Sequence, residues 1–579
     1  MGHRAISPAG TAHYIVPISQ RPNADARPEA DLIVDGALVT DSNTVVLNGS
    51  TSGLGTINAA LGTLVYGGSV AQTVSTIDST AVVNNIIINN KAGVTLPTTL
   101  TVNSTLTINA GAKLTNPDGA ILTVKNVTIN TDIPLGPGTF VDKGNTYTNT
   151  GGVSTVQQYL TGGRNWYISS PVTTATPGSL TTASSVYNYN EPTTAWILES
   201  SALSVLKGYA AGVQSTGTVT FTGGALNTGA PENSWLTSSG GAKSGYNLVG
   251  NPYPSYLNFD LVNASSTNLE STMWYRTKNT GNTAYVFDTY NAASGVGTGN
   301  NGVNVTSLIP PVQSFWVRVA NGFNSGILGV NNSMRSHADL TTNRLKVKGQ
   351  ANSGQQLLRL QVSNGVNSDQ AVVLFNAKAS NGFDSFDSEK MSNNLASVPE
   401  IYTLAGTEPL VINGLNSISS NEELPLGFTS GEGNTFTIKA TEINNFDPDL
   451  KIILKDKMLN TEKELVIGND YSFTSDAIST STRFSILFKT STVITGAINP
   501  DYTGSESLYI FKNQNNQITI HRNDPIGEGT VTVYNATGQK IVNIPTTGVV
   551  TLVNNKLLPG VYMVTVNAQG KNTTKKITL

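Results

Sequence analysis

The sequence predicts an all-β protein built from tandem modules, and three observations support this prediction. Charged residues make up only 12% of the chain, well below the roughly 25% of an average soluble domain, and strand-favouring threonine, valine and isoleucine are abundant. No segment shows helical periodicity for more than two turns. A hydrophobic fraction of 38% with a net charge of −3 favours folded structure, because disorder requires low hydrophobicity together with high net charge.

The same composition excludes several classes of function. The chain has no cysteine, which excludes disulfides, thiolate nucleophiles and cysteine-based metal sites. Its near-neutral charge gives no electrostatic reason to expect nucleic acid or an anionic membrane as a partner. No apolar run approaches the ~18–20 residues that cross a bilayer, so we expect no transmembrane segment.

Residues 1–30 predict a flexible leader, since they contain several prolines and three arginines but no apolar core of the kind that a signal peptide has. Residues 31–159 predict a β-solenoid-like or short-strand β domain. Short β-runs alternate there with Asn- and Gly-rich turns, as in a parallel β-helix whose rungs bury alternate aliphatic residues. A β-sandwich with short strands is the alternative, because no strict repeat is present. The clearest runs are 94–96, 100–102, 106–108, 113–114, 121–124 and 127–129.

Residues 160–335 predict a β-sandwich domain that holds the tryptophans of the chain. Three of them, Trp166, Trp274 and Trp316, lie inside alternating strands, which is typical of core anchors. Aromatic faces also stack on sugars while amide groups bind the hydroxyls. The other two, Trp196 and Trp235, are therefore the candidates for contact with a glycan.

Residues 336–490 predict a second β-sandwich domain, and residues 491–505 predict a linker rich in turn residues. Within the second sandwich, Asp384, Asp387 and Glu389 lie close together in the sequence. Ca²⁺ binds several oxygen ligands on a flexible turn, so these carboxylates are a candidate structural Ca²⁺ site, although their spacing departs from the EF-hand pattern. The alternative is a polar loop closed by Asp side chains on neighbouring backbone N–H groups.

Residues 506–579 predict a small β-sandwich. Alternation places Val531 and Val533 on one face of a strand, and the turn that follows puts Gly538 at a left-handed position. A Pro-Gly turn then precedes a second alternating strand, and two lysines lie near the end of the chain. The remaining positions of this pattern are Tyr534, Pro559, Gly560, Tyr562, Val564, Lys575 and Lys576.

These motifs resemble the C-terminal sorting domain of the type IX secretion system. The resemblance implies that the segment is the address recognised by the outer-membrane translocon. It also implies that the protein passes through the periplasm of a Bacteroidetes-type bacterium and is secreted or held at the cell surface. That route begins with Sec export, so we expect a signal peptide, which the start of this sequence does not show. Asp78-Ser79-Thr80 resembles a short Bacteroidetes O-glycosylation acceptor, which makes Ser79 a candidate acceptor; a chance match is the alternative.

The sequence gives little support for catalysis. The histidines, His3, His13, His337 and His521, are too scattered for a His-based triad or zinc site, and residues 31–135 carry few charges for a polysaccharide lyase. We therefore expect a non-enzymatic, modular surface or secreted protein. It would act as an adhesin, a surface-layer component or a self-assembling fibre subunit joined through exposed strand edges. The alternative is a secreted protein that binds or degrades polysaccharide, with surface glycans as partners. No cofactor is expected beyond the candidate structural Ca²⁺.

Overall fold

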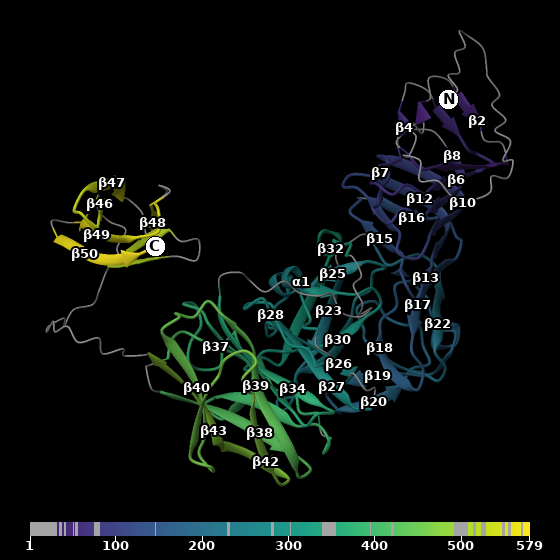
Figure 1. The fold of residues 1–579 in the computed structure, drawn as a ribbon. Coiled ribbons are helices and arrows are strands. Elements are labelled where there is room, and N and C mark those ends of the chain that lie inside the picture. Colours follow the sequence, from purple (N-terminus) through teal and green to yellow (C-terminus); the bar gives the residue numbers. More distant parts are fainter. Residues whose placement is uncertain are drawn as a thin grey trace. The chain divides into compact units, whose positions relative to one another are not determined.

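The computed structural model divides the chain into two units, Met1–Ser491 and Thr492–Leu579. Strands dominate the described residues, which include one short α-helix, α1 (Phe259–Ser265) (Figure 1). The predicted all-β fold with tandem modules is therefore confirmed. The structure describes residues 32–33, 37–39, 42–49, 51–52, 56–74, 82–144, 146–228, 232–241, 243–279, 283–300, 303–338, 355–393, 395–418, 422–490, 508–512, 517–522, 529–546, 550–553, 557–568 and 571–579.

Three predictions fall on other residues. The leader at 1–30, the linker at 491–505 and the candidate acceptor Ser79 all lie outside the described ranges.

A β-solenoid opens the first unit, as the short runs predicted. Leu64, Ile86, Leu106 and Val127 are neighbours across four parallel strands, and all four are fully buried. Parallel pairing in register thus stacks one aliphatic residue of each rung on the next. The long solenoid sheet contains β3 (Thr44–Leu47), β6 (Thr63–Tyr66), β8 (Val82–Ile88), β10 (Thr99–Ile108), β12 (Ile121–Ile129), β16 (Thr146–Asn149) and β17 (Ser154–Leu160).

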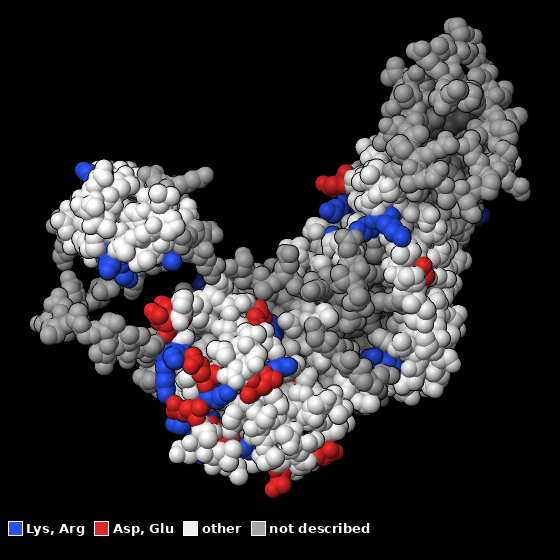
Figure 2. All heavy atoms as spheres, in the orientation of Figure 1, with Lys and Arg blue, Asp and Glu red and all other residues white. Residues whose placement is uncertain are grey.

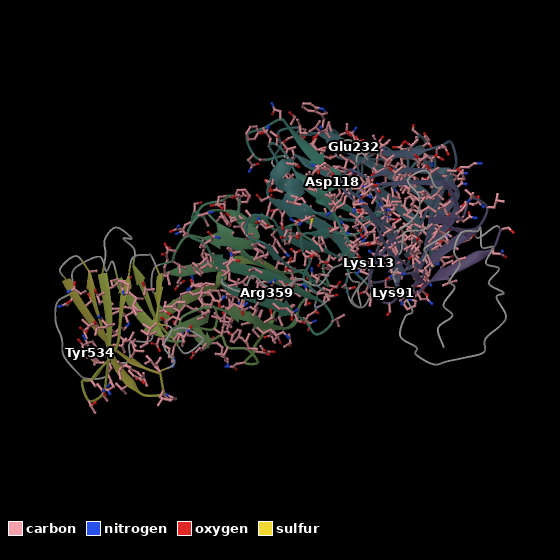
Figure 3. All side chains as sticks on the ribbon, turned by 90° about the horizontal axis from the view of Figure 1, so that it is seen from above. Lys91, Lys113, Asp118, Glu232, Arg359 and Tyr534 are labelled. Carbon is pink, nitrogen blue, oxygen red and sulfur yellow. The ribbon has the colours of Figure 1, made fainter. Side chains whose placement is uncertain are left out.

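A second parallel sheet completes the rungs, and charged side chains lie in the bends and turns between strands. Lys91 and Asp118, labelled in Figure 3, are both exposed and come from different turns. The second sheet contains β7 (Gln72–Thr73), β9 (Val94–Thr95), β11 (Lys113–Asn116) and β15 (Thr139–Asp142). Short pairs accompany the solenoid: β1 (Leu32–Ile33) with β4 (Thr51–Ser52), β2 (Ala37–Val39) with β5 (Thr56–Asn58), and β13 (Thr131–Asp132) with β14 (Gly136–Pro137).

The strand boundaries differ from the prediction at two places, where neighbouring runs join into one strand. The runs 121–124 and 127–129 join in β12. The runs 100–102 and 106–108 were expected as separate strands, but they join in β10, with a shift of register between Val102 and Thr105. Side-chain amides satisfy the backbone at this irregularity: Thr105 N donates to Asn85 Oδ1 at 3.2 Å, and Asn126 Nδ2 donates to Ser104 O at 3.1 Å. The hydrogen-bonded ladder therefore continues through the shift instead of ending there.

Antiparallel sheets follow the solenoid. The last solenoid strand, β17, pairs antiparallel with β22, and one aliphatic core continues from the solenoid into the next sheet, whose order is β18-β21-β19-β20. The strands are β18 (Arg164–Ile168), β19 (Ala183–Asn190), β20 (Ala195–Leu198), β21 (Tyr209–Val213) and β22 (Gly217–Gly223), with a 3-10 turn at Pro177–Ser179.

A second group of antiparallel sheets packs around the buried Trp274 and Phe315. Its largest sheet has the order β24-β30-β26-β27-β28. The strands are β23 (Glu232–Thr237), β24 (Tyr246–Gly250), β25 (Tyr256–Asn258), β26 (Thr272–Lys278), β27 (Tyr285–Asn291), β28 (Val296–Gly297), β29 (Leu308–Ile309), β30 (Ser314–Arg318), β31 (Ser325–Val330) and β32 (Arg335–Ser336), with a 3-10 turn at Asn332–Met334.

An eleven-stranded sheet ends the first unit. Charged side chains gather over its β40 and β43 part in Figure 2, where exposed pairs such as Lys451–Glu464 form. The strands are β33 (Gln356–Ser363), β34 (Ser368–Phe375), β35 (Ser388–Glu389), β36 (Glu400–Ala405), β37 (Glu408–Leu415), β38 (Glu423–Ser430), β39 (Asn434–Asn444), β40 (Leu450–Asp456), β41 (Thr461–Glu464), β42 (Tyr471–Ser475) and β43 (Ile478–Thr490).

The second unit is a small sandwich of two antiparallel sheets around its own core. Val531, Val533 and Val564 are fully buried there, and Gly538 has a φ of 83° in the turn after β46, as the alternation and turn residues predicted. The strands are β44 (Leu508–Lys512), β45 (Ile518–Arg522), β46 (Gly529–Asn535), β47 (Lys540–Thr546), β48 (Val550–Leu552), β49 (Val561–Ala568) and β50 (Lys571–Thr578).

Candidate functional site

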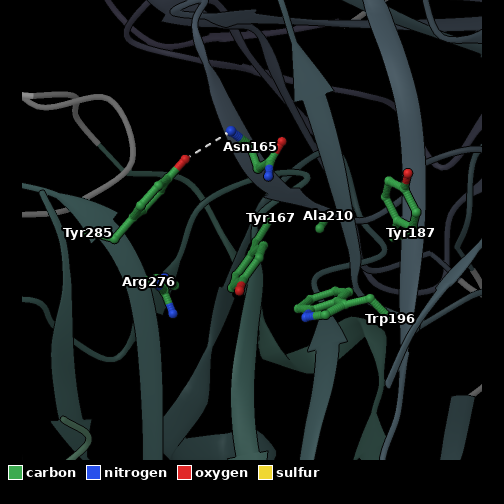
Figure 4. Close-up of a pocket in the computed structure, with 7 residues that line it drawn as sticks. All are labelled: Asn165, Tyr167, Tyr187, Trp196, Ala210, Arg276 and Tyr285. Atoms are coloured by element: carbon green, nitrogen blue, oxygen red, sulfur yellow. Dashed lines mark hydrogen bonds between the residues drawn. The ribbon is translucent and has the colours of Figure 1, made fainter. Parts of the chain in front are cut away.

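An open pocket of about 390 Å³ lies between the β18-β21-β19-β20 sheet and the neighbouring strands β26 and β27 (Figure 4). Its lining is mostly aromatic, with one amide and one guanidinium group. The lining residues are Asn165, Tyr167, Tyr187, Trp196, Ala210, Arg276 and Tyr285.

Strand alternation creates one wall of the pocket. Tyr167, Ala210 and Tyr187 form one row across β18, β21 and β19, so their side chains share a face of the sheet. The neighbouring residues Ile168 and Val186 point to the other face, where they are buried in the aliphatic core. One face of this sheet is therefore anchored and the other is left to line a cavity.

An aromatic cluster forms the base of the same wall. The Trp196 ring centroid lies 5.8 Å from that of Tyr167, 5.4 Å from that of Tyr189 and 6.0 Å from that of Trp316. Trp316 is 7% exposed and packs against the cluster from the buried side, whereas Trp196 on β20 is 41% exposed. The cluster holds Trp196 in place while its ring remains accessible to a ligand.

The opposite wall comes from β26 and β27. Arg276 on β26 lies with its guanidinium carbon 5.1 Å from the centroid of the Tyr285 ring. The backbone N–H of Asn165 donates to the Tyr285 hydroxyl at 3.0 Å, a bond drawn in Figure 4. This bond joins the two walls, so residues distant in sequence form one site.

The chemistry of the lining suits binding through rings and hydrogen bonds. Burial raises the pKa of the Tyr167 phenol, opposed by the nearby Arg276, so the hydroxyl stays neutral and can both donate and accept. Among the residues that the structure describes, those lining the pocket include no carboxylate. The pocket thus offers ring faces, hydroxyls, an amide and a cation to a ligand.

The structure separates the two tryptophans that the sequence singled out for a glycan. Trp196 lines the pocket, whereas Trp235 lies on β23, pairs with Ile327 on β31 and is 75% exposed. Sequence reasoning missed Tyr167, Tyr187, Asn165, Arg276 and Tyr285. The alternation of Tyr187 and Tyr189 opposite the core residue Val186 was the one signal that could have indicated part of this wall.

The predicted Ca²⁺ ligands do not come together as a set of three. Asp387 accepts from Asp384 N at 2.7 Å and from Gly414 N at 2.8 Å, and Asp384 accepts from Phe386 N at 2.8 Å. Glu389 instead accepts from Tyr246 Oη at 2.9 Å. Among the described residues, no group of three or more His, Asp or Glu side chains is placed to hold a metal ion. The two aspartates thus bind backbone N–H groups, which was the alternative interpretation.

A buried charge cluster was also missed. Arg318 donates through Nη1 to Glu270 at 3.3 Å and to Glu389, and through Nε to Ser244 O at 3.2 Å. Burial raises the pKa of Glu270 to about 7, with Arg318 lowering it and Glu389 raising it further. The Glu270 and Glu389 side chains are only 9% and 14% exposed, so this carboxylate pair neutralises Arg318 inside the protein and does not line the pocket.

The predicted sorting residues form two groups in the second unit. Val531, Val533, Val564 and Tyr562 are buried, and the Tyr562 hydroxyl donates to Leu558 O at 2.7 Å. The other group lies at the surface: Gly538, Pro559, Lys575 and Lys576 are exposed, and Tyr534 and Gly560 are half-buried. The first group builds the core, and the second is accessible to a receptor.

Comparison with known families identifies both parts of the chain. A family model described as Domain of unknown function (DUF8693) matches residues 71–488, and one described as Secretion system C-terminal sorting domain matches residues 514–579. No curated protein matches the chain.

The second match confirms the predicted route and location. The sorting domain engages the type IX secretion machinery, which exports the protein to the cell surface or the extracellular space. Within the described residues, none of the helices has the length and apolarity needed to cross a membrane. The chain therefore belongs to the DUF8693 family and is a cargo protein of the type IX secretion system.

Proposed function

We propose that this protein is a non-enzymatic, adhesin-type binding protein that recognises glycans outside the cell through the pocket around Trp196. The observation that carries the proposal is the open aromatic wall of Tyr167, Tyr187 and Trp196, which includes the amide of Asn165 and faces Arg276. Sugar rings stack on aromatic faces, and convergent polar groups fix their orientation. Secretion brings this pocket into contact with extracellular and cell-surface polysaccharides.

The absence of a carboxylate among the lining residues supports binding without hydrolysis. Glycoside hydrolysis uses two carboxyl groups that flank the scissile bond. The buried Glu270 and Glu389 are occupied by Arg318, so they do not supply such a pair to the pocket.

The test is binding of the full chain to an array of neutral and acidic polysaccharides, followed by affinity electrophoresis on the polymers that bind. We expect Trp196→Ala to weaken binding about tenfold or more, as for a central aromatic contact. Trp235→Ala is the matched control, because it removes an exposed strand tryptophan outside the pocket, and it should leave binding unchanged. Equal losses in both variants, or no binding to any polymer, would overturn the proposal.

A reducing-end assay on the bound polymers tests the non-enzymatic part. We expect no release of new reducing ends during prolonged incubation with the wild-type protein. Release that persists after repurification would show a hydrolase or lyase and contradict this part of the proposal.

A second candidate function is self-assembly, favoured by the edge strand β20. This strand is the last of its sheet among the described residues, and Ile197 and Leu198 are 45% and 61% exposed. An exposed apolar edge is a template for pairing with another strand. Analytical ultracentrifugation should then show oligomers that Ile197→Lys dissociates, because a charge on an edge strand opposes strand addition; a monomer at all concentrations excludes this candidate.

A further inference from the structure

The pocket concentrates positive charge on one aromatic ring. The charged groups of Arg276, Lys278 and Arg164 lie 5.1, 4.6 and 5.8 Å from the centroid of the Tyr285 ring. This convergence occurs in a chain with only 34 Lys and Arg among 579 residues. Register explains part of it, because Lys278 pairs with Tyr285, and Arg276 pairs with Phe287 two residues further along the same strands.

Several buried cations of the first unit have carboxylate partners, although the buried Arg335 instead donates to hydroxyl, amide and carbonyl oxygens. Arg318 pairs with Glu270 and Glu389, Arg359 with Glu442, Arg483 with Asp456, and Lys390 with Asp369. Arg276 differs from them. In the part of the chain that the structure describes, its guanidinium contacts the rings of Tyr285 and Phe287 and makes no ion pair with a carboxylate.

The neighbouring Arg164 adds to the excess charge. Its guanidinium carbon lies 3.9 Å from the Trp166 ring centroid, and its buried Nε has no hydrogen-bond partner among the described residues. Contacts with aromatic rings hold a cation in place but, unlike an ion pair with a carboxylate, do not neutralise its charge. A positive cleft with low-dielectric walls attracts anions.

We propose that the ligand of this pocket is an acidic saccharide, with its sugar ring on Trp196 and Tyr167 and its carboxylate or sulfate group on Arg276. The planar guanidinium suits such oxyanions because two parallel N–H groups can donate to two oxygens. This inference rests on the proposed glycan binding and specifies the class of glycan.

The experiment compares polymers that share a backbone and differ in charge. Polygalacturonate is set against its methyl ester for the carboxylate, and dextran sulfate against dextran for the sulfate. We expect the full chain to bind at least one acidic member about tenfold or more tightly than its neutral counterpart, as charge-assisted hydrogen bonds predict. The pair of polymers that shows the difference in affinity identifies the anion as a carboxylate or a sulfate.

Variants then assign the effect to Arg276. Arg276→Gln should lose about tenfold or more of the affinity for the acidic polymer and should show a weaker dependence of binding on NaCl. Arg276→Lys keeps the charge but loses the paired donors, so its affinity should lie between those of the wild type and Arg276→Gln. Lys451→Gln is the control for the loss of one exposed cation and should leave affinity unchanged. Circular dichroism and thermal melting of each variant check that it is folded.

The outcomes separate the inference from the function on which it rests. Equal binding to neutral and acidic polymers, lost in Trp196→Ala and retained in Arg276→Gln, overturns the acidic-saccharide inference and leaves glycan binding standing. Acidic binding that falls equally in Arg276→Gln and Lys451→Gln also overturns it, since it shows only diffuse charge attraction. Failure to bind any polymer overturns both proposals.

Discussion

The solenoid and the region of residues 160–335 that follows it, called the aromatic region below, are both rich in threonine. They differ in what the faces of their strands contact. In the solenoid, the inward residues of successive rungs, such as Ile86, Leu106 and Val127, stack on one another and are fully buried. In the β18-β21-β19-β20 sheet, one face joins that aliphatic core while the other presents Tyr167, Tyr187 and Trp196 to a cavity. Stacking of similar rungs thus fills the core of the solenoid. The sheet that follows does not continue this stacking, and its second face lines the concave surface on which a ligand can bind.

The largest effect on stability is expected when an inward-facing rung residue of the solenoid is truncated. Leu106→Ala leaves a cavity between Ile86 and Val127, and we expect it to lower the free energy of unfolding by about 2–5 kcal/mol. Urea unfolding of the full chain, followed by intrinsic fluorescence, measures the change. Thr107→Ala, on the outward face of the same strand, is the control and should change much less. A loss below about 1 kcal/mol for Leu106→Ala would mean that the ladder collapses around the gap.

The aromatic region should differ from the solenoid in its dependence on pH. Burial raises the pKa of Glu270 from 4.5 to about 7, so between these pH values the folded protein holds a proton that the unfolded chain releases. Stability contributed by this group is present below about pH 4.5 and is lost as pH rises to about 7. The expected decrease is on the order of 1–3 kcal/mol.

Glu270→Gln should remove that part of the pH dependence, because glutamine stays neutral and can still accept from Arg318. Unfolding of wild type and variant at a series of pH values from 5 to 8 measures the difference. Glu464→Gln, a half-exposed partner of Lys451, is the control. A wild-type profile that Glu270→Gln leaves unchanged would show that Glu270 is ionised throughout this range.

A corner of the solenoid should be less sensitive than its core. Asn90 is fully buried, and its side chain donates to Val70 O at 2.6 Å and Gln72 Oε1 at 2.8 Å while accepting from Ala92 N at 2.7 Å. Asn90→Ala removes these three hydrogen bonds from a buried corner, and we expect a loss of about 1–3 kcal/mol. Thermal unfolding compares it with the exposed neighbour in Asn89→Ala. If both variants melt alike, water replaces the Asn90 side chain at this corner.

The smallest effect is expected at the exposed tryptophan of the aromatic region. Trp235 is 75% exposed, so Trp235→Ala should change the free energy of unfolding by about 1 kcal/mol or less. The same urea unfolding measures it beside Leu106→Ala. A loss as large as that of Leu106→Ala would indicate that another copy of the chain covers Trp235 in solution. The wild type and Trp235→Ala would then differ in sedimentation.

Local patterns predicted those features whose cause lies within a few residues. Alternation placed Val531 and Val533 in the core of the second unit, and turn chemistry placed Gly538 at a positive φ, because side-chain period and backbone freedom are local properties. The same logic predicted the solenoid. It separated runs that β10 joins, because side-chain amides from the adjacent rungs carry the strand through its irregularity.

The candidate site could be predicted only in part. The sequence singled out Trp196, but nothing near it indicated Arg276 or Tyr285, and Glu270 gave no sign of meeting Glu389 at Arg318. It also grouped Glu389 with Asp384 and Asp387, whereas the strand β35 turns Glu389 towards Tyr246. Contacts of this kind depend on how sheets pack, which spacing along the chain does not encode.

Composition, alternation and a local motif are sufficient to predict that this protein is all-β and carries a type IX sorting domain. The packing of the sheets is what brings Asn165, Trp196, Arg276 and Tyr285 into one pocket and leaves Arg276 without a carboxylate partner among the described residues. The physical reason is that a binding site is made by side chains from strands that meet only when separate sheets pack together, whereas each strand is specified by its own residues.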